Sequence, residues 1–212
     1  MGDERPRVEL WAEGVHLLSG DPAFGPIVSM SGPILEGRDE RTNFEALARS
    51  IVFQQLAGKA AATIHRRLQE TLGGVVEPET VLAADPDDLR SAGLSRNKLR
   101  AIEDLAIKVR DGVVRLDDLD RQADDDVIER LTMVRGIGRW TAEMFLMFRL
   151  SRPDVWPVGD LGVRNGWARV HRLAALPSAD DLAVSGEPYR PWRSVVAWYC
   201  YRAVELLPPV DV

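Results

Sequence analysis

Two glycines on either side of one apolar residue form the first group in this sequence that could bind a ligand. Gly136 and Gly138 flank Ile137, and Arg135 and Arg139 stand outside them. Glycine accepts positive φ angles and lets a backbone come close to a ligand. With helices on both sides, Ile137 can fill the gap between them while the surrounding amides and the helix start bind an anion such as a phosphate. A plain helix–turn–helix connection with a C-cap glycine explains the same residues, and the motif alone leaves both interpretations open.

One carboxylate follows beyond the next helix. We expect an apolar helix from 139 to about 150, which Pro153 and Pro157 then interrupt, and Asp160 comes next. A carboxylate at this place can stabilise positive charge that develops in a transition state. It can equally cap a helix that begins at Leu161, so both roles stay open.

Four short runs give the chain a resemblance to a known family. They are Ser-Ile-Val-Phe-Gln-Gln (50–55), Gly-Ile-Gly-Arg-Trp-Thr-Ala (136–142), Pro-Val-Gly-Asp (157–160) and Pro-Trp-Arg-Ser (191–194). Together and in this order they resemble the helix-hairpin-helix superfamily of DNA glycosylases, most closely the 3-methyladenine DNA glycosylase II type. The resemblance extends from about residue 44 to 202, which is most of the chain.

The resemblance implies a catalytic role for Asp160. It matches the family's catalytic aspartate, which stabilises the developing sugar cation and helps to place the attacking water. Trp140 matches the position at which bifunctional relatives carry a nucleophilic lysine, and no lysine follows Lys108. Because a Schiff-base lyase step then has no amine in this region, the resemblance implies a monofunctional enzyme.

The resemblance also implies which residues meet the base and the DNA. Tyr201 stands where this type often has a pocket tryptophan, and Trp198 lies one helical turn before it. The implied base-pocket residues are Trp140, Met144, Trp198 and Tyr201. The implied DNA-binding residues are Gln55 and Leu56, on a loop that wedges into the gap left by the extruded nucleotide, and Arg135, Gly136, Ile137, Gly138 and Arg139 in the hairpin.

Three departures from the family pattern affect details. Arg135 stands where the hairpin usually has proline, and we expect its restored N–H and its charge to help grip a phosphate. Met144 replaces a frequent tyrosine, which leaves the pocket less aromatic and the substrate range open. The amino-terminal β-rich domain of longer relatives is missing, so we expect the compact form of the fold.

The chemistry of alkylated purines fits these residues. An enzyme that acts on a base in duplex DNA must take it out of the stack. A purine such as 3-methyladenine carries positive charge and is already a good leaving group, so the enzyme mainly needs ring faces for the cation and a carboxylate for the sugar. Trp140, Trp198 and Tyr201 offer the rings, although core packing remains the alternative for each of them.

The composition predicts a soluble enzyme of modest size. The chain has 212 residues, 45% of them hydrophobic, and neither a signal peptide nor an apolar run of about 18 residues, so we expect no membrane association or export. Cys200 is alone, which excludes disulfides within the chain and the four-cysteine iron–sulfur cluster of endonuclease III-type relatives. His16, His65 and His171 lack metal-ligand spacing. We expect no cofactor, and whether the hairpin holds a structural monovalent cation stays open.

The net charge of −6 is unusual for a DNA-binding protein. Acidic residues gather between 117 and 126, where we expect a solvated loop and helix start away from DNA. We expect the basic residues to form one face of a polarised surface. These are Arg96, Lys98, Arg100, Arg135, Arg139, Arg164, Arg169, Arg190 and Arg193.

The fold class expected from these patterns is all-α. Residues 1–42 read as irregular, and the segment 93–98 offers either a second phosphate contact or a simple capped turn. Hydrophobic spacing and capping residues predict helices at about 43–55, 59–72, 95–110, 124–133, 139–150, 161–173 and 188–206, with short ones opened by Asp85-Pro86 and by Ser178. We expect two helical lobes with a cleft between them: 1–57 with 161–212, and 58–160, which contains the hairpin unit at about 124–149.

The leading hypothesis is a monofunctional glycosylase for alkylated purines in double-stranded DNA, acting as a monomer. We expect it in the cytoplasm at the bacterial nucleoid, or in the nucleus of a eukaryote. One alternative keeps the glycosylase fold and shifts the substrate to deaminated or other lesions. Another is a non-catalytic helix-hairpin-helix module that only grips the DNA backbone, for which Asp160 would have no use.

Overall fold

A computed structural model describes residues 11–32, 34 and 40–209 of the chain. Within these residues every regular element is helical, as expected for the all-α class. The chain divides into two compact units, and the change from one to the other falls inside one helix, between Phe145 and Leu146. None of the helices in these ranges is long and apolar enough to cross a membrane.

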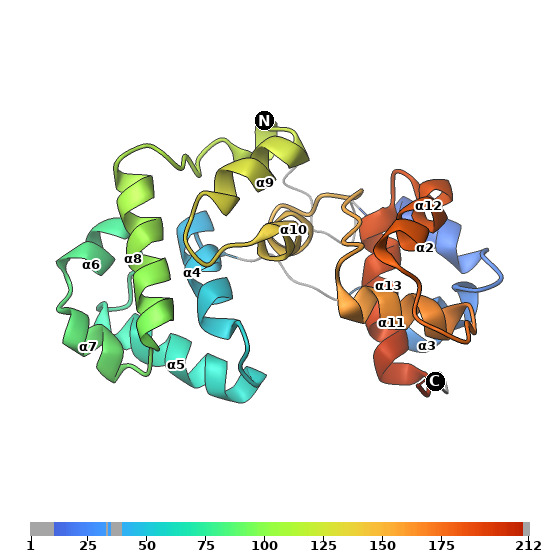
Figure 1. Ribbon diagram of the computed structural model, residues 1–212, viewed down its shortest axis with the longest axis horizontal. Coiled ribbons are helices and arrows are strands. Elements are labelled where there is room, and N and C mark those ends of the chain that lie inside the picture. Colours follow the sequence, from blue (N-terminus) through green and yellow to red (C-terminus); the bar gives the residue numbers. More distant parts are fainter. Residues whose placement is uncertain (1–10, 33, 35–39, 210–212) are drawn as a thin grey trace. The chain divides into compact units, whose positions relative to one another are not determined.

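The first unit contains described residues 40–145 (Figure 1). Helix α8 packs against α4 and α6, and the apolar side chains of Leu47, Ile51, Ile102 and Leu105 are fully buried. Its elements are α4 (Asn43–Phe53), α5 (Gly58–Thr71), α6 (Pro78–Ala83), α7 (Pro86–Ser91), α8 (Arg96–Arg110), the 3-10 turn η1 (Leu119–Arg121), α9 (Asp124–Thr132) and most of α10 (Arg139–Phe148).

The caps expected from the sequence begin several of these helices. The Asp85 carboxylate accepts from the Asp87 amide, and the Ser95 hydroxyl accepts from the Lys98 amide. The simple capped turn at 93–98 is therefore confirmed. Each cap satisfies an amide that the first helical turn leaves without a partner.

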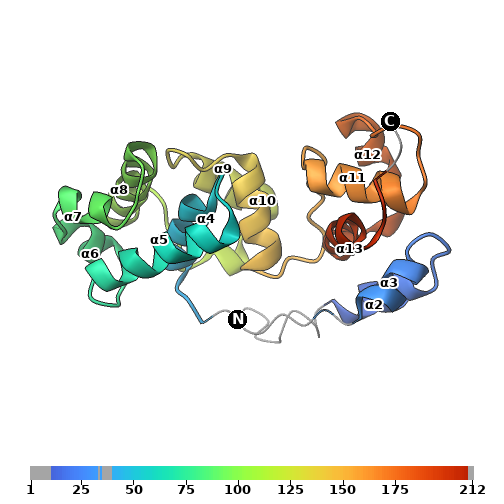
Figure 2. The same cartoon turned by 90° about the horizontal axis from the view of Figure 1, so that it is seen from below.

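The second unit joins the two ends of the described chain. Helices α2 (Ala12–Ser19) and α3 (Gly25–Ser31) pack against α13 (Arg193–Leu206), so the blue and red segments lie side by side in Figures 1 and 2. The other elements are α11 (Leu161–Val170), α12 (Ala179–Gly186) and the 3-10 turn η2 (Glu187–Tyr189). Helix α12 begins with the expected capping box, in which Ser178 and Asp181 each accept from the other's amide.

The expectation that residues 1–42 are irregular is wrong for α2 and α3. The Asp21 carboxylate accepts from the amides of Ala23 and Phe24 and so organises the start of α3. Gly14 lies where a Cβ would come within 2.9 Å of Trp192 and Val195. These helices are stabilised by contacts with distant residues, which a local pattern of glycine and proline does not reveal. Residues 1–10, 33 and 35–39 of the expected segment lie outside the described residues.

Three expected boundaries also differ from the structure. Residues 40–57 lie in the first unit because α4 packs on α5 and α8, while 146–160 lie in the second, where the amide of Ser194 donates to Pro153. The helix expected at 188–206 begins at Arg193, because Pro188 and Pro191 lie in the turn before it.

Candidate nucleic-acid and catalytic site

The hairpin has the backbone conformation that its glycines permit. Gly136 adopts φ +80°, whereas Gly138 lies outside the left-handed region. Ile137 is 3% exposed, so its side chain is buried, and its amide donates to the Val134 carbonyl. A Cβ at Gly138 would meet nothing within 4 Å. Packing within the protein therefore does not require glycine there, and the missing side chain leaves the outer face of the hairpin open.

A carboxylate on α8 holds the hairpin from inside. Asp104 Oδ2 accepts from the Arg135 amide at 2.7 Å and from Lys108 Nζ at 2.6 Å. Lys108 Nζ also donates to the Met133 carbonyl at 2.7 Å. Burial acts to raise the pKa of Asp104. The hydrogen bonds from Lys108 and Arg135 outweigh burial and hold this pKa below its ordinary value. The expectation that the Arg135 N–H grips a phosphate is wrong, because Asp104 takes that amide.

The loop after α4 presents two residues to solvent. Gln55 adopts φ +56° and is exposed, and the Leu56 side chain is 40% exposed. Lys98 Nζ donates to the carbonyls of Val52 and Gln54 at 2.6 and 2.8 Å. The amine of Lys98 therefore fixes the start of the loop from within the protein. Burial also lowers its pKa.

Gln54 links this loop to the hairpin and was not singled out from the sequence. Its Nε2 donates to the Gly136 carbonyl at 2.9 Å and lies 3.3 Å from Thr141 Oγ1. Its side chain spans two segments that are far apart in the sequence. The only available signal was its place beside Gln55 in the Ser-Ile-Val-Phe-Gln-Gln run.

A cavity of about 460 Å³ opens beside the hairpin in the first unit. Trp140 and Met144 line it from α10, together with Gly136 and Thr141. Its other lining residues come from α4 and the following loop: Arg49, Ser50, Phe53, Gln54 and Gln55. The Arg49 guanidinium lies 3.8 Å from the centre of the Phe53 ring. The structure thus brings two of the four expected pocket residues together around a space of small-ligand size.

Asp160 is 7% exposed and lies at the start of α11 in the second unit. Its Oδ1 accepts from the Val163 amide at 2.8 Å, which makes it the N-cap of α11. Its Oδ2 accepts from the hydroxyl of Tyr201 at 3.0 Å. The capping role is confirmed. It does not exclude catalysis, because two carboxylate oxygens offer about four acceptor positions.

The other two expected pocket residues lie on α13, in the second unit. Tyr201 contacts Asp160 and also packs near Phe148, with ring centres 6.4 Å apart. Trp198 packs edge-on against Tyr199, with 4.9 Å between their ring centres. The Arg202 guanidinium lies 5.9 Å from the centre of the Trp198 ring.

Ion pairs anchor the segment that leads to Asp160. Arg193 donates to both carboxylate oxygens of Asp154, and the Val155 amide donates to the Ser194 hydroxyl. Arg190 also pairs with Asp154. Two arginines expected on a basic face therefore hold this segment, Arg193 at the start of α13 and Arg190 in the turn before it. In the same unit, Arg169 donates to the carbonyls of Val204 and Leu207.

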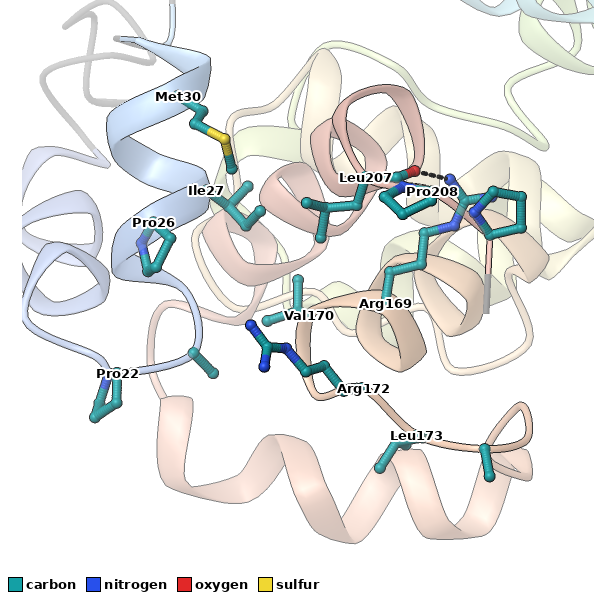
Figure 3. A pocket seen from close by; sticks show the side chains of 13 residues that line it. Pro22, Pro26, Ile27, Met30, Arg169, Val170, Arg172, Leu173, Leu207 and Pro208 are labelled. Carbon is teal, nitrogen blue, oxygen red and sulfur yellow. Dashed lines mark hydrogen bonds between the residues drawn. The ribbon is translucent and has the colours of Figure 1, made fainter. Parts of the chain in front are cut away.

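A second cavity, of about 880 Å³, lies between α3, the end of α11 and the residues after α13 (Figure 3). Pro26, Ile27 and Met30 line it from α3, and the side chains of Arg169 and Arg172 line it from the end of α11 and the residues that follow. No candidate catalytic residue lines it. No group of three potential metal ligands occurs among the residues that the structure describes.

Comparisons with known proteins agree with the sequence motifs. Residues 48–189 match the model of the HhH-GPD superfamily base excision DNA repair proteins. The chain is 32% identical to DNA-3-methyladenine glycosylase 1 of Schizosaccharomyces pombe over 91% of this chain and 86% of that protein. It is 33% identical to the DNA-3-methyladenine glycosylase of Saccharomyces cerevisiae over 73% of this chain and 57% of that protein.

Solved structures show the same fold. The S. pombe 3-methyladenine DNA glycosylase in complex with abasic DNA matches with a TM-score of 0.80 and 32% identity, over 90% of this chain and 95% of that chain. The DNA-3-methyladenine glycosidase of Bacillus halodurans matches with a TM-score of 0.78 and 30% identity, over 96% and 91%.

Proposed function

Because this chain belongs to the HhH-GPD superfamily of base excision DNA repair proteins, we propose that it is a DNA glycosylase for alkylated purines. It hydrolyses the N-glycosidic bond of 3-methyladenine and 7-methylguanine in double-stranded DNA. The observation that carries this proposal is Asp160, a nearly buried carboxylate whose oxygens accept from the Val163 amide and from the Tyr201 hydroxyl. A module that only binds DNA has no use for such a group beyond helix capping.

Each part of the first unit contributes to binding. The hairpin at Gly136 and Gly138 holds a DNA phosphate, a contact that positions the duplex without reading its sequence. Gln55 and Leu56 enter the gap in the duplex, which suits their exposure on a loop that Lys98 fixes. The cavity beside Trp140 receives the extruded base.

Asp160 acts on the sugar. As the C1′–N bond breaks, its electron pair leaves with the base, and positive charge develops on the sugar ring. The carboxylate stabilises that charge and orients a water molecule. The water oxygen then bonds to C1′ and releases a proton, which gives a free base and an abasic sugar. An alkylated purine leaves as a neutral base, so no strong general acid is needed.

The remaining properties belong to the same proposal. The enzyme works as a monomer, without an iron–sulfur cluster, on DNA in the bacterial cytoplasm or in a eukaryotic nucleus. A monovalent cation held by hairpin carbonyls is its one candidate cofactor.

The test is release of free bases from methylated duplex DNA, with Asp160→Asn run beside the wild type. Asparagine is as good an N-cap as aspartate, so the variant keeps the helix start and its fold. Wild type releases 3-methyladenine, and the variant binds DNA equally but reacts slower by on the order of 10²–10³, the range for loss of one electrostatic stabiliser. A variant with full activity contradicts the mechanism.

Duplexes that contain hypoxanthine or ethenoadenine separate the alternatives. Release of those bases without 3-methyladenine assigns the enzyme to other lesions. Binding without release from any duplex leaves a DNA-binding module and overturns the proposed reaction.

A further inference from the structure

We propose that Tyr201 is a positioning residue, whose hydroxyl fixes the orientation of the Asp160 carboxylate. This inference rests on the proposed function and assigns a role that the sequence did not suggest. The sequence offered Tyr201 as a ring beside the base. In the structure its hydroxyl donates to Asp160 Oδ2 at 3.0 Å.

Two glycines on α11 make this contact possible. A Cβ at Gly166 would lie 2.0 Å from the Cys200 carbonyl oxygen, so α11 and α13 touch through their backbones. A Cβ at Gly162 would lie 2.9 Å from Tyr201 Cε1 and 3.0 Å from Asp160 Oδ1. The missing side chain at Gly162 therefore provides the space in which the phenol ring reaches the carboxylate.

The hydrogen bonds that Val163 and Tyr201 donate to Asp160 have different roles. The bond from the Val163 amide to Oδ1 belongs to the helix cap and anchors one oxygen. The terminal torsion of an aspartate is soft, so a carboxylate held at one oxygen can still rotate. The Tyr201 hydroxyl donates to the second oxygen and so restricts that rotation.

The hydroxyl and the ring of Tyr201 make different contacts, so their roles can be tested separately. Packing against Phe148, at 6.4 Å between ring centres, needs only the ring. Tyr199 offers a matched comparison on the same helix. Its side chain is fully buried, and its hydroxyl has no hydrogen-bond partner among the described residues.

The experiment compares Tyr201→Phe with Tyr199→Phe. Base release from methylated duplex DNA is measured in single turnover with excess enzyme, and DNA affinity is measured separately. We expect Tyr201→Phe to react about tenfold slower, the size expected for one lost hydrogen bond to a charged group. DNA affinity stays unchanged. Tyr199→Phe keeps the wild-type rate.

Three results would overturn the inference. These are a wild-type rate in Tyr201→Phe, an equal loss of rate in Tyr199→Phe, or a loss of DNA affinity in place of rate. The carbon-13 chemical shift of the Asp160 carboxyl group, compared between wild type and Tyr201→Phe at pH 7, provides a readout independent of activity. An unchanged chemical shift overturns the contact even if the wild type proves inactive on methylated DNA, and that inactivity by itself contradicts only the proposed function.

Discussion

At the scale of single residues, competing interpretations of a side chain can both hold. Asp160 stood between a helix cap and a catalytic group when only its neighbours in the sequence were known. Its Oδ1 makes the cap, while Oδ2 accepts from a tyrosine on another helix. The cap could be predicted because it depends on residues three positions apart. The Tyr201 contact could not, since it depends on the packing of α11 against α13.

His65 makes folding stability depend on pH. It is 7% exposed, and burial together with the charges of Arg49 and Arg41 lowers its pKa to about 4. In the unfolded chain the pKa is about 6.5. Between these values the unfolded state binds more protons than the folded state, so stability falls as the pH falls. We expect His65 to account for a loss of about 2 kcal/mol between pH 7 and pH 5.

Urea unfolding of His65→Leu and wild type at both pH values measures this contribution. The variant should lose about 2 kcal/mol less between pH 7 and pH 5 than the wild type. His171, whose pKa burial also lowers, is present in both proteins and cancels in the comparison. Equal losses in the two proteins would show that His65 titrates alike in the folded and unfolded chains.

At the scale of elements, capped helices could be predicted, and helices that depend on packing could not. Ser95, Asp85 and Ser178 each begin a helix as expected, because a cap acts within three residues. Helices α2 and α3 were missed because their stability comes from α13, far away in the sequence. Gln54 could not be predicted as a site residue for the same reason, because its partner Gly136 is also far away in the sequence.

The two hairpin glycines should respond differently to alanine. Gly136→Ala forces a side chain into φ +80° and places its Cβ 3.2 Å from Ala101 Cβ. We expect it to lower the free energy of unfolding by about 1–2 kcal/mol. Gly138→Ala meets open space and an ordinary φ, so stability should stay within about 0.5 kcal/mol of wild type.

DNA binding distinguishes the hairpin's function from its folding. The methyl group of Gly138→Ala occupies the face on which a phosphate would approach. We therefore expect weaker binding to every duplex sequence alike, measured by fluorescence anisotropy. Normal affinity in Gly138→Ala, or a loss confined to one sequence, would contradict the role of the hairpin.

At the scale of the whole molecule, the sequence predicted that both chain ends share one unit. It placed the boundaries at 57 and 160, whereas the structure places them near 39 and 145. The difference arises because α4 buries its apolar face on α5 and α8. The expectation that the basic residues form one face for DNA also changes. Arg190 and Arg193 pair with Asp154, so part of the basic content holds the fold and is not left for DNA.

The distribution of lysines over the chain predicts the product of the reaction. The sequence contains lysine only at 59, 98 and 108. Lys98 donates to two carbonyls and Lys108 to Asp104, so both amines act within the protein. Lys59 is exposed at the start of α5. Lyase chemistry requires an amine that attacks C1′ of the sugar and forms a Schiff base. The family resemblance predicts that Trp140 stands where bifunctional relatives have that amine.

We therefore expect the enzyme to leave abasic strands uncleaved. Methylated duplex DNA treated with the protein should stay intact on a denaturing gel until alkali is added, and borohydride should trap no covalent complex. Alkali-treated samples serve as the control that abasic sites have formed. A trapped complex in wild type that persists in Lys59→Met would require an amine outside the described side chains, such as the amino terminus. Its disappearance in that variant would make Lys59 the nucleophile, and either result would contradict a purely hydrolytic reaction.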